Sequence, residues 1–234
     1  MSVTSLIRFL KFRAKVAHAF YRKSNINILK RFNTTSGGFI LLSSLAEALN
    51  LDSIIKINDA ADVSAHRINQ LQASQNLVTH FVEKSPTIRH ELNGKPFLDQ
   101  TNLGISISHS STHIAVLIIQ KAASCGIDIE SNERQITRLA KKFTTPKELS
   151  ALEKIDSHNK PLLLWTLKEC LFKTINTSGV DFKSHLNLIS ATQENEEILA
   201  VCEINHPSIK GRLFTKSFIF DNHIVTYCDT PLEK

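Results

Sequence analysis

A five-residue segment near the middle of the chain constrains its fold most. Residues 126–130 read Gly-Ile-Asp-Ile-Glu. Because successive side chains of a strand point to opposite faces, this alternation predicts a strand whose two isoleucines face a core. Asp128 and Glu130 then share the other face, about 6–7 Å apart. Magnesium prefers oxygen ligands, so this pair can share one hard cation with waters and substrate phosphate oxygens. The segment therefore predicts two ligands of a metal site on a buried sheet.

A second acidic segment has the pattern of an amphipathic helix. Within residues 162–173, Trp165 and Phe172 lie seven positions apart on one apolar stripe. Glu169 and Lys173 are four positions apart, so they project from one side of that helix. Taken alone, these two charges predict an ordinary surface ion pair worth roughly a few tenths of a kcal/mol. An isolated Asp-x-Glu strand is likewise usually a solvated face, so neither segment decides a function by itself.

The order and spacing of the segments are more specific. Gly-Ile-Asp-x-Glu is followed by Trp-x-x-Lys-Glu-x-x-x-Lys, with Asp128 and Glu169 41 positions apart. Residues 93–98, 106–110 and 143–148 read Asn-Gly-Lys-Pro-Phe-Leu, Ser-Ile-Ser-His-Ser and Phe-Thr-Thr-Pro-Lys-Glu. In these five ordered segments the chain resembles the 4′-phosphopantetheinyl transferases of the larger, surfactin-synthetase-activating type. Five ordered matches are far more specific than one short motif.

The resemblance implies both a fold and a reaction. Such enzymes are α+β proteins built as two similar α/β subdomains in one chain, with coenzyme A and the metal in the cleft between them. The halves here would be about 1–119 and 120–234, the second carrying the metal ligands. The reaction would be that of a holo-acyl-carrier-protein synthase. It transfers the phosphopantetheine arm of coenzyme A to a serine of an apo acyl or peptidyl carrier protein and releases adenosine 3′,5′-bisphosphate.

The resemblance also implies a role for each site residue. Mg²⁺ would be held against the diphosphate by Asp128, Glu130 and Glu169, acting as a Lewis acid and template. Phosphate contacts would come from Lys95, Ser108, His109, Lys168 and Lys173. Lys173 would also assist turnover by neutralising charge.

A base must take the serine proton, and the sequence leaves its identity open. Glu148 is the first candidate, directly or through a metal-held water, and Glu169 competes with it. Glu148 also suits the first turn of a helix, since Thr-Thr-Pro precedes it. His109 has a structural alternative as well, because it suits the cap of a turn.

Periodicity supports an α+β fold with helices on small antiparallel sheets. Helices are predicted at residues 43–49, 64–82, 136–143 and 162–173, and strands at 103–107, 113–119, 126–130, 187–191, 198–204, 210–220 and 223–227. Related enzymes carry arginines on the helix before the Gly-Lys-Pro turn. Here Arg67 is present, whereas Gln75 stands at the next expected position.

The net charge and the amino-acid composition limit the classes of molecule that this protein is expected to bind. The formal charge of +6 on 234 residues suits steering of a small acidic carrier protein. A basic nucleic-acid-binding protein is the rival class, and an inactive relative is a second rival. With one Trp, two Tyr and no zinc-finger or RNA-recognition signature, we expect no nucleic-acid partner. Four widely spaced cysteines and no long apolar run predict a soluble, cytoplasmic protein without a membrane span. The resemblance to the two-subdomain transferases implies a monomer.

The N-terminus is unusually basic. Residues 1–46 contain eight Lys or Arg and no Asp or Glu. This pattern is compatible with a basic amphipathic helix for an anionic surface or with a transit peptide. We favour a part of the folded first half with a basic face that attracts acidic partners. Candidate coenzyme contacts there are Arg22, Lys23, Lys30 and Arg31.

Overall fold

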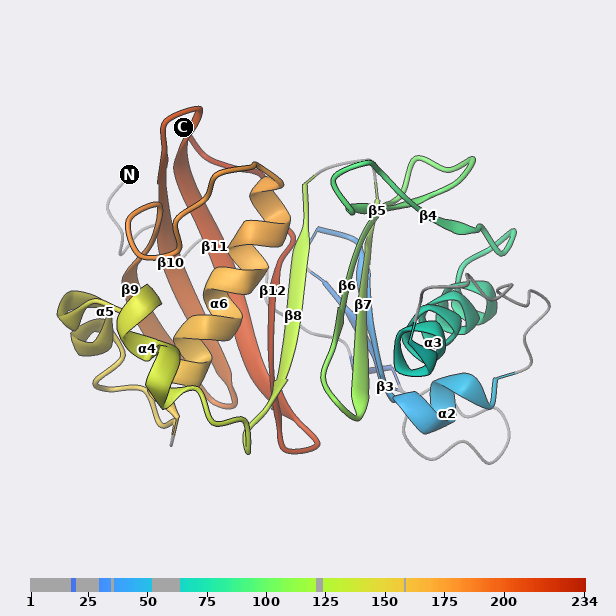
Figure 1. Ribbon diagram of the computed structural model, residues 1–234, viewed down its shortest axis with the longest axis horizontal. Helices are drawn as coiled ribbons and strands as arrows, with labels where there is room; N and C mark the ends of the chain where they lie inside the picture. The colour runs from blue at the N-terminus through green and yellow to red at the C-terminus, as the bar shows by residue number, and fades with distance from the viewer. Residues whose placement is uncertain (1–17, 20–29, 35, 52–63, 121–123, 158) are drawn as a thin grey trace.

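The computed structural model describes residues 18–19, 30–34, 36–51, 64–120, 124–157 and 159–234, and it shows an α+β protein (Figure 1). Its first five-stranded antiparallel sheet has the order β1-β2-β3-β7-β6. These strands are His18–Ala19 (β1), Lys30–Asn33 (β2), Phe39–Ser44 (β3), Gly104–His109 (β6) and His113–Ile119 (β7). A separate two-stranded ribbon consists of Ile88–His90 (β4) and Pro96–Leu98 (β5).

A second five-stranded antiparallel sheet has the order β8-β12-β11-β10-β9. Its strands are Gly126–Ser131 (β8), Leu186–Glu194 (β9), Glu197–His206 (β10), Ile209–Phe220 (β11) and His223–Cys228 (β12). Edge strand β6 of the first sheet lies beside edge strand β8 of the second (Figure 1). The two sheets therefore meet at the strand that carries the acidic motif.

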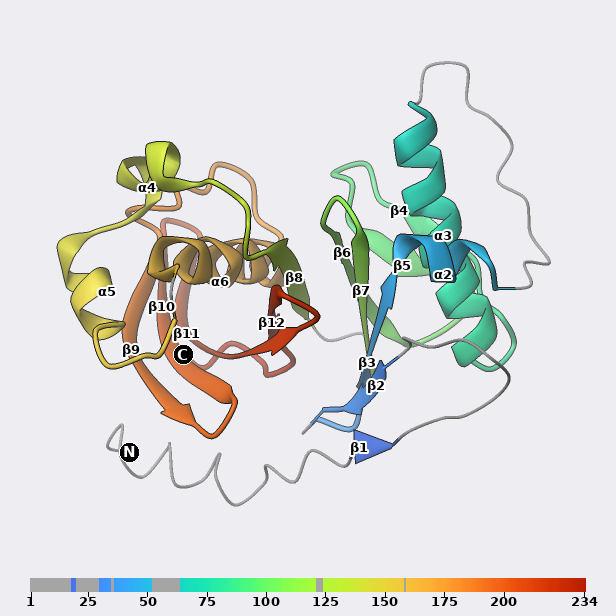
Figure 2. The ribbon, with the colours of Figure 1, turned by 90° about the horizontal axis from the view of Figure 1, so that it is seen from below.

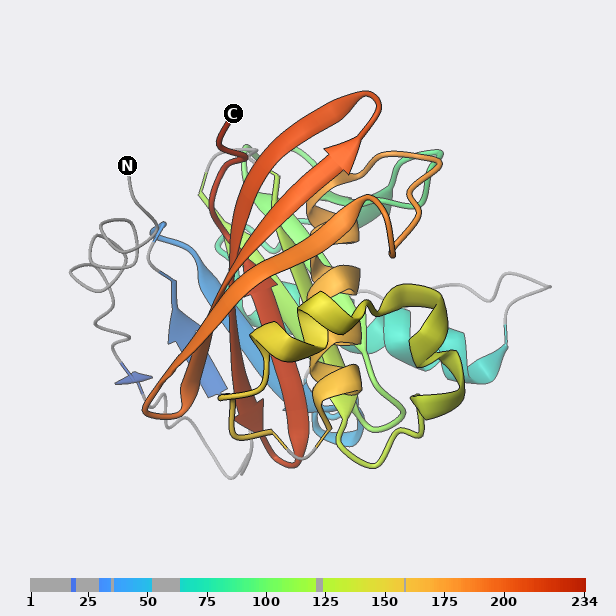
Figure 3. The ribbon, with the colours of Figure 1, turned by 90° about the vertical axis from the view of Figure 1, so that its left-hand side faces the viewer.

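Each sheet carries helices on one face. The first is covered by α2 (Leu45–Leu49) and α3 (Ala65–Phe81). The second is covered by α6 (Lys160–Ile175), with α4 (Thr137–Phe143) and α5 (Pro146–Ala151) on its outer side (Figures 2 and 3). No helix in the described part of the chain has the length and apolar character needed to span a bilayer.

A third cluster of buried apolar side chains lies between the two sheets. Strand β7 shows how the layers divide, because every residue from His113 to Ile119 is buried. Its even-numbered positions Ile114, Val116 and Ile118 pack toward α3, and the alternate positions pack toward the second sheet. A strand covered on both faces reads as a continuous apolar run, which is why this segment lacks a polar face.

Strand β8 has the two faces that its alternation predicts. Ile127 and Ile129 are fully buried in the core between the sheets. Asp128 and Glu130 project to the other face, toward α6, where they too are buried. The prediction for this strand is therefore confirmed, and its carboxylates lie beneath a helix rather than in open solvent.

Helix α6 begins and ends at residues that suit helix termini. The Asn159 side chain accepts a hydrogen bond from the backbone N–H of Leu162, and a proline occupies the first turn. At the other end Asn176 adopts the left-handed conformation, with φ of 47° and ψ of 49°, which asparagine tolerates better than most residues. The observed helix extends the predicted one by one turn or less at each end.

Most predicted elements are confirmed, and one needs correction. Residues 39–44 form strand β3, so the helix predicted at 43–49 begins only at Leu45. Ser44 is its N-cap, because its side chain accepts from the backbone N–H of Glu47. The basic segment at residues 1–17 and 20–29, with Arg22 and Lys23, lies outside the described residues. The division near residue 120 stays a prediction.

A close approach between β8 and α6 depends on Gly126. A Cβ atom built there would overlap the carbonyl oxygen of Cys170 and the hydroxyl of Thr174. The Cys170 thiol donates to the Gly126 carbonyl oxygen at 3.3 Å. Glycine thus allows the helix to lie directly against the strand, which brings the two acidic segments together.

We expect Gly126→Ala to lower the free energy of unfolding by about 2–4 kcal/mol, because the added methyl group must push α6 away from β8. Urea denaturation measures this loss. Gly94→Ala is the matched control, since its Cβ would meet nothing within 4 Å and only its φ of 86° opposes alanine. That variant should lose about 1 kcal/mol. Equal losses in both variants would contradict the packing argument.

Candidate functional site

The candidate site lies where the edge strands β6 and β8 meet. The backbone N–H of Ile127 donates to Ser106 Oγ at 3.0 Å. The hydroxyl of Ser108 donates to Asp128 Oδ1 at 2.7 Å. Both contacts are buried, and both join the first sheet to the second through serine side chains of the Ser-Ile-Ser-His-Ser segment. This segment and the acidic strand are therefore one structural unit.

Asp128 is the centre of this unit. Lys173 Nζ on α6 donates to Asp128 Oδ1 at 2.8 Å and to the carbonyl oxygen of Ile127 at 3.0 Å. The other carboxylate oxygen, Asp128 Oδ2, is buried and has no hydrogen-bond partner among the residues that the structure describes. A buried acceptor without a donor is costly, and a carboxylate oxygen especially so. Asp128 thus leaves one oxygen available for a cation or a donor that is not part of the chain.

The other two predicted ligands lie in the same neighbourhood. Glu130 Oε1 accepts from the indole N–H of Trp165 at 3.1 Å and forms an ion pair with Arg134. Burial raises the pKa of Glu130, and the charge of Asp128 adds to the effect. Burial raises the pKa of Glu169 to about 7, with further contributions from Asp128 and Glu130. The charge of Asp128 therefore acts on both glutamates, and the charge of Glu130 acts on Glu169.

The donor set suits a hard divalent cation. Among the described residues, no three His, Cys, Asp or Glu side chains already form a ligand cluster. In the present arrangement Lys173 and Arg134 supply the positive charges beside Asp128 and Glu130. The buried Asp128 oxygen, for which the described residues supply no donor, is the observation that indicates room for a cation. Three carboxylates in that situation fit Mg²⁺ in chemistry and charge.

Two cavities flank the Gly-Lys-Pro turn beside these acids. One, of about 200 Å³, has Lys95 on the wall from the turn and Lys173 on the wall from α6. The other, of about 320 Å³, is lined by Arg67 and His109. The two share the lining residues Gly94, Pro96 and Ile107. Four basic side chains thus line adjoining spaces. Three of them, Lys95, His109 and Lys173, are the ones that the resemblance predicts to contact phosphate.

His109 is neutral in this environment at physiological pH. Its Nε2 lies 3.1 Å from Ser74 Oγ, and the Ser74 hydroxyl donates to the carbonyl oxygen of Gln70 at 2.8 Å. The pKa of His109 is lowered from 6.5 to about 4, mainly by burial and in addition by the charges of Arg67 and Lys173. Because the Ser74 proton goes to Gln70, the single N–H of the neutral imidazole is the one that faces Ser74, so His109 brings neither a free donor nor a full charge to a phosphate in this arrangement. The positive charge near His109 comes instead from Arg67.

Gln75 has a structural position. Its side-chain amide donates to Thr79 Oγ1 at 3.1 Å and to the carbonyl oxygen of Pro86 at 3.0 Å. Its carbonyl oxygen accepts from the backbone N–H of Ile88 at 2.8 Å. The residue therefore ties α3 to the strand that leads into the turn. This explains what an amide does at the position where an arginine was expected.

The structure does not bring Lys168 and Glu148 to the acidic cluster. Lys168 is fully buried, and its Nζ lies 2.7 Å from Glu148 Oε1. The same ammonium donates to the carbonyl oxygens of Phe143 and Phe182 at 2.7 and 2.8 Å. Three acceptors use its three protons, so none remains for a phosphate. This geometry does not support the predicted phosphate contact of Lys168.

Glu148 is equally occupied. Its Oε2 accepts from the backbone N–H and the hydroxyl of Thr145, both at 2.9 Å, in a capping box at the start of α5. Its Oε1 accepts from the backbone N–H of Leu188 at 3.1 Å and pairs with Lys168. The helix-start alternative is thus the one observed. A carboxylate with this set of partners is poorly placed to receive a serine proton.

Comparison with known families agrees with this geometry. Residues 124–228 match the family model of the 4′-phosphopantetheinyl transferase superfamily. The matched region runs from the start of β8 to the end of β12 and includes the three acids and Lys173. No curated protein matches the chain. The superfamily match supports a phosphopantetheinyl transferase activity in general.

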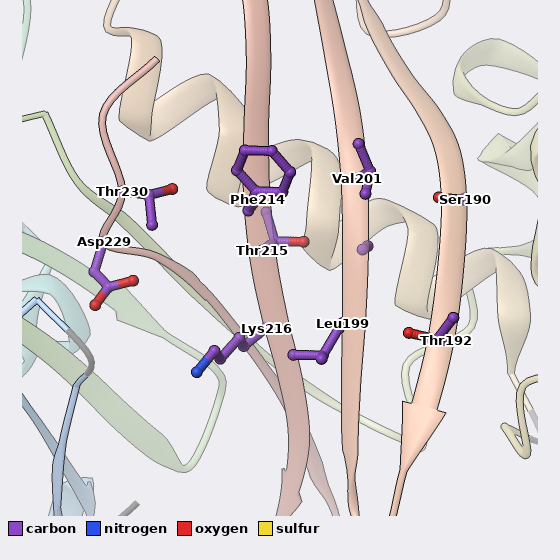
Figure 4. Close-up of a pocket in the computed structure, with 10 residues that line it drawn as sticks. Ser190, Thr192, Leu199, Val201, Phe214, Thr215, Lys216, Asp229 and Thr230 are labelled. Carbon is purple, nitrogen blue, oxygen red and sulfur yellow. The ribbon is translucent and has the colours of Figure 1, made fainter. Parts of the chain in front are cut away.

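A further cavity within the transferase-superfamily region is not an alternative site. It has a volume of about 20 Å³, room for about one water molecule, and lies over β9, β10 and β11. Ser190, Thr192 and Lys216 each place a buried polar atom there without a hydrogen-bond partner. Figure 4 shows Lys216 pointing away from the two hydroxyls. These groups do not converge on one position, so they do not form a binding site.

The sequence patterns did not identify several residues that contact the candidate site residues. Arg134 forms an ion pair with Glu130. Ser106 accepts a hydrogen bond from the backbone of β8, and Ser74 is hydrogen-bonded to His109. Ser106 belongs to the Ser-Ile-Ser-His-Ser segment, so its place at the site could be predicted from the sequence. Arg134 and Ser74 lie in segments without a motif, and only the fold places them at the site.

We expect Lys168→Met to destabilise the fold by about 3–5 kcal/mol, because it leaves the Glu148 carboxylate buried without its counter-charge. Urea denaturation measures the change, and exposed Lys147→Met on α5 is the matched control, with an expected effect within about 0.5 kcal/mol. If Lys168→Met lowered coenzyme A affinity at unchanged stability, the buried-pair assignment would be wrong.

His109 should make the protein acid-sensitive. Its pKa is lower in the folded state than in the unfolded state, so its contribution is intact above about pH 6.5 and is lost as the pH falls toward 4. We expect His109→Gln to remove on the order of 3 kcal/mol of this pH dependence. Unfolding curves between pH 4 and 8 test it, with exposed His80→Gln as control. Parallel curves for wild type and His109→Gln would refute the lowered pKa.

Proposed function

We propose that this protein transfers 4′-phosphopantetheine from coenzyme A to a serine of an apo acyl or peptidyl carrier protein in a Mg²⁺-dependent reaction. The observation that carries the proposal is the environment of Asp128. Ser108 and Lys173 hold one of its oxygens from two sides, and its other oxygen is buried without a partner. That carboxylate lies within the region matched to the transferase superfamily and beside the cavity lined by Lys95 and Lys173.

The cations around this cavity suit the diphosphate of coenzyme A. Lys95 and Lys173 line the 200 Å³ space from two different elements, the turn and α6, so a diphosphate in it would have two positive charges to contact. Arg67 and His109 line the adjoining space, which we assign to the nucleotide and its 3′-phosphate. Ser108 lies at the boundary of the two halves, where its hydroxyl proton is donated to Asp128, so it positions that carboxylate rather than a phosphate. Fixed cations such as the two lysines stabilise charge that develops on phosphate oxygens.

In the reaction the serine oxygen forms a bond to the phosphorus next to pantetheine. The bond between that phosphorus and the bridging oxygen breaks, and adenosine 3′,5′-bisphosphate leaves with the electron pair. Phosphoryl transfer of this type depends mainly on alignment and on electrostatic stabilisation. Lys173 would neutralise the 5′-phosphate oxygens of the leaving adenosine 3′,5′-bisphosphate, because it contacts Asp128 and lines the cavity.

We propose Glu169 in preference to Glu148 as the acceptor of the serine proton. Glu148 is enclosed by Lys168, Thr145 and Leu188. Glu169 is only partly buried and lies on the same side of α6 as Lys173, so its carboxylate is more accessible to a serine proton than that of Glu148. Asp128, Glu130 and Glu169 are the residues that would hold Mg²⁺. When bound, the ion would supply Lewis-acid stabilisation of the diphosphate.

The surface next to the acids suits an acidic helical partner. Helix α4 exposes Arg138, Lys141 and Lys142 together with the apolar side chain of Leu139. Basic residues around an exposed leucine offer both steering and a contact for a small acidic carrier protein. The rival interpretation as a nucleic-acid-binding protein has no comparable support, because three acids lie where a nucleic-acid phosphate would need a cation.

Incubation of the protein with coenzyme A, Mg²⁺ and apo carriers tests the proposal by mass spectrometry of the carrier. We expect a phosphopantetheine mass on at least one acyl or peptidyl carrier. Asp128→Asn should reduce labelling at least a hundredfold, because it keeps the shape and the acceptor oxygen but removes the charge. Exposed Asp156→Asn is the matched control and should label normally. No labelling of any carrier, or salt-sensitive DNA binding alone, would overturn the proposal.

A further inference from the structure

A side-chain contact spans the mouth of the 200 Å³ cavity. Asn93, in the turn between β4 and β5, accepts from the backbone N–H of Lys95 at 3.0 Å through its Oδ1. Its Nδ2 donates to Asn176 Oδ1 at 3.4 Å, at the end of α6. Both asparagines line the cavity, as do Lys95 and Lys173. One amide thus contacts both the turn that carries Lys95 and the helix that carries Lys173.

The position of Asn176 follows from how α6 ends. Its backbone N–H donates to the carbonyl oxygen of Phe172 at 3.0 Å, and its left-handed backbone turns the chain away from the helix axis. Lys173 lies one turn earlier on the same helix and reaches Asp128. Asn176 therefore extends the helix wall of the cavity toward the opposite turn.

The turn itself has little other support from the second half of the chain. Its own hairpin is held by backbone hydrogen bonds from Glu91 to Lys95 and from Gly94 to Glu91, both of 2.9 Å. Residues 91–94 are exposed, and Leu92 at the tip is fully exposed. The strands of the ribbon are held by the Gln75–Ile88 hydrogen bond and by buried Leu98, so the exposed tip is the part that a contact across the cavity can position.

We propose that the Asn93–Asn176 contact fixes the Gly-Lys-Pro turn across the cavity, so that Asn176 is a positioning residue that holds Lys95 opposite Lys173 for a diphosphate. The inference rests on the proposed function, since coenzyme A is the ligand for which these two lysines are held. Asn176 acts through the turn and not on the reacting atoms. Its loss should therefore weaken coenzyme binding and leave the chemical step nearly unchanged.

Asn176→Gly separates this role from a role in folding. Glycine adopts the left-handed conformation more easily than asparagine, so the helix end is kept while the amide contact is removed. We expect the dissociation constant of coenzyme A and its KM to rise about three- to tenfold. The turnover number should change less than twofold, and the unfolding midpoint should not fall. Asn195→Gly, at a left-handed and exposed position in the β9–β10 turn, is the matched control and should leave all four quantities unchanged.

A double-mutant cycle tests whether the two amides act together. Asn93→Ala alone should weaken coenzyme binding, and Asn176→Gly should add nothing in that background. Calorimetry with coenzyme A gives the binding constants without a carrier. If wild type binds coenzyme A and labels a carrier but Asn176→Gly binds equally well, the positioning role is refuted and the proposed function stands. If wild type binds no coenzyme A, both fail.

Discussion

The rest of the site depends on the hydrogen bonds that the buried carboxylate of Asp128 accepts. It receives the Ser108 hydroxyl from the first sheet and the Lys173 ammonium from α6, so one side chain connects three elements. A carboxylate at this depth is stable only with such donors. Gly126 makes the arrangement possible, because a larger residue would hold α6 away from the strand. The acids and the phosphate-binding cations therefore share one location.

The two adjacent residues at the centre of α6 have different tasks. Lys168 faces the interior and pairs with Glu148, which caps α5 and binds the backbone of β9. Burial, and after it the charge of Asp128, raises the pKa of Glu169. The buried pair thus holds the outer helices and the sheet to α6, and the helix in turn places Lys173 on the wall of the cavity. A residue inside a recognised motif can be structural while its neighbour is chemical.

The predictions from sequence succeeded where a short-range pattern controls the outcome. Alternation placed Asp128 and Glu130 on one face of a strand, and a spacing of four placed Glu169 and Lys173 on one side of a helix. The boundary between β3 and α2 was missed, because an apolar run such as residues 39–42 has no period that separates strand from helix. The roles of Lys168 and Glu148 depend on partners twenty residues apart in sequence, which a motif does not reveal.

The sequence by itself determined the strand and helix that carry the acids, the superfamily resemblance and the chemistry of the donor set. Local backbone geometry makes these properties readable, because side-chain direction follows directly from the period of the element. Only the tertiary structure decided which charges meet. It paired Lys168 with Glu148 inside the fold, left one Asp128 oxygen without a donor, and placed Asn93 against Asn176 across the cavity. Such contacts depend on how elements that are distant in the chain pack together, and a local sequence pattern does not show which of these elements meet.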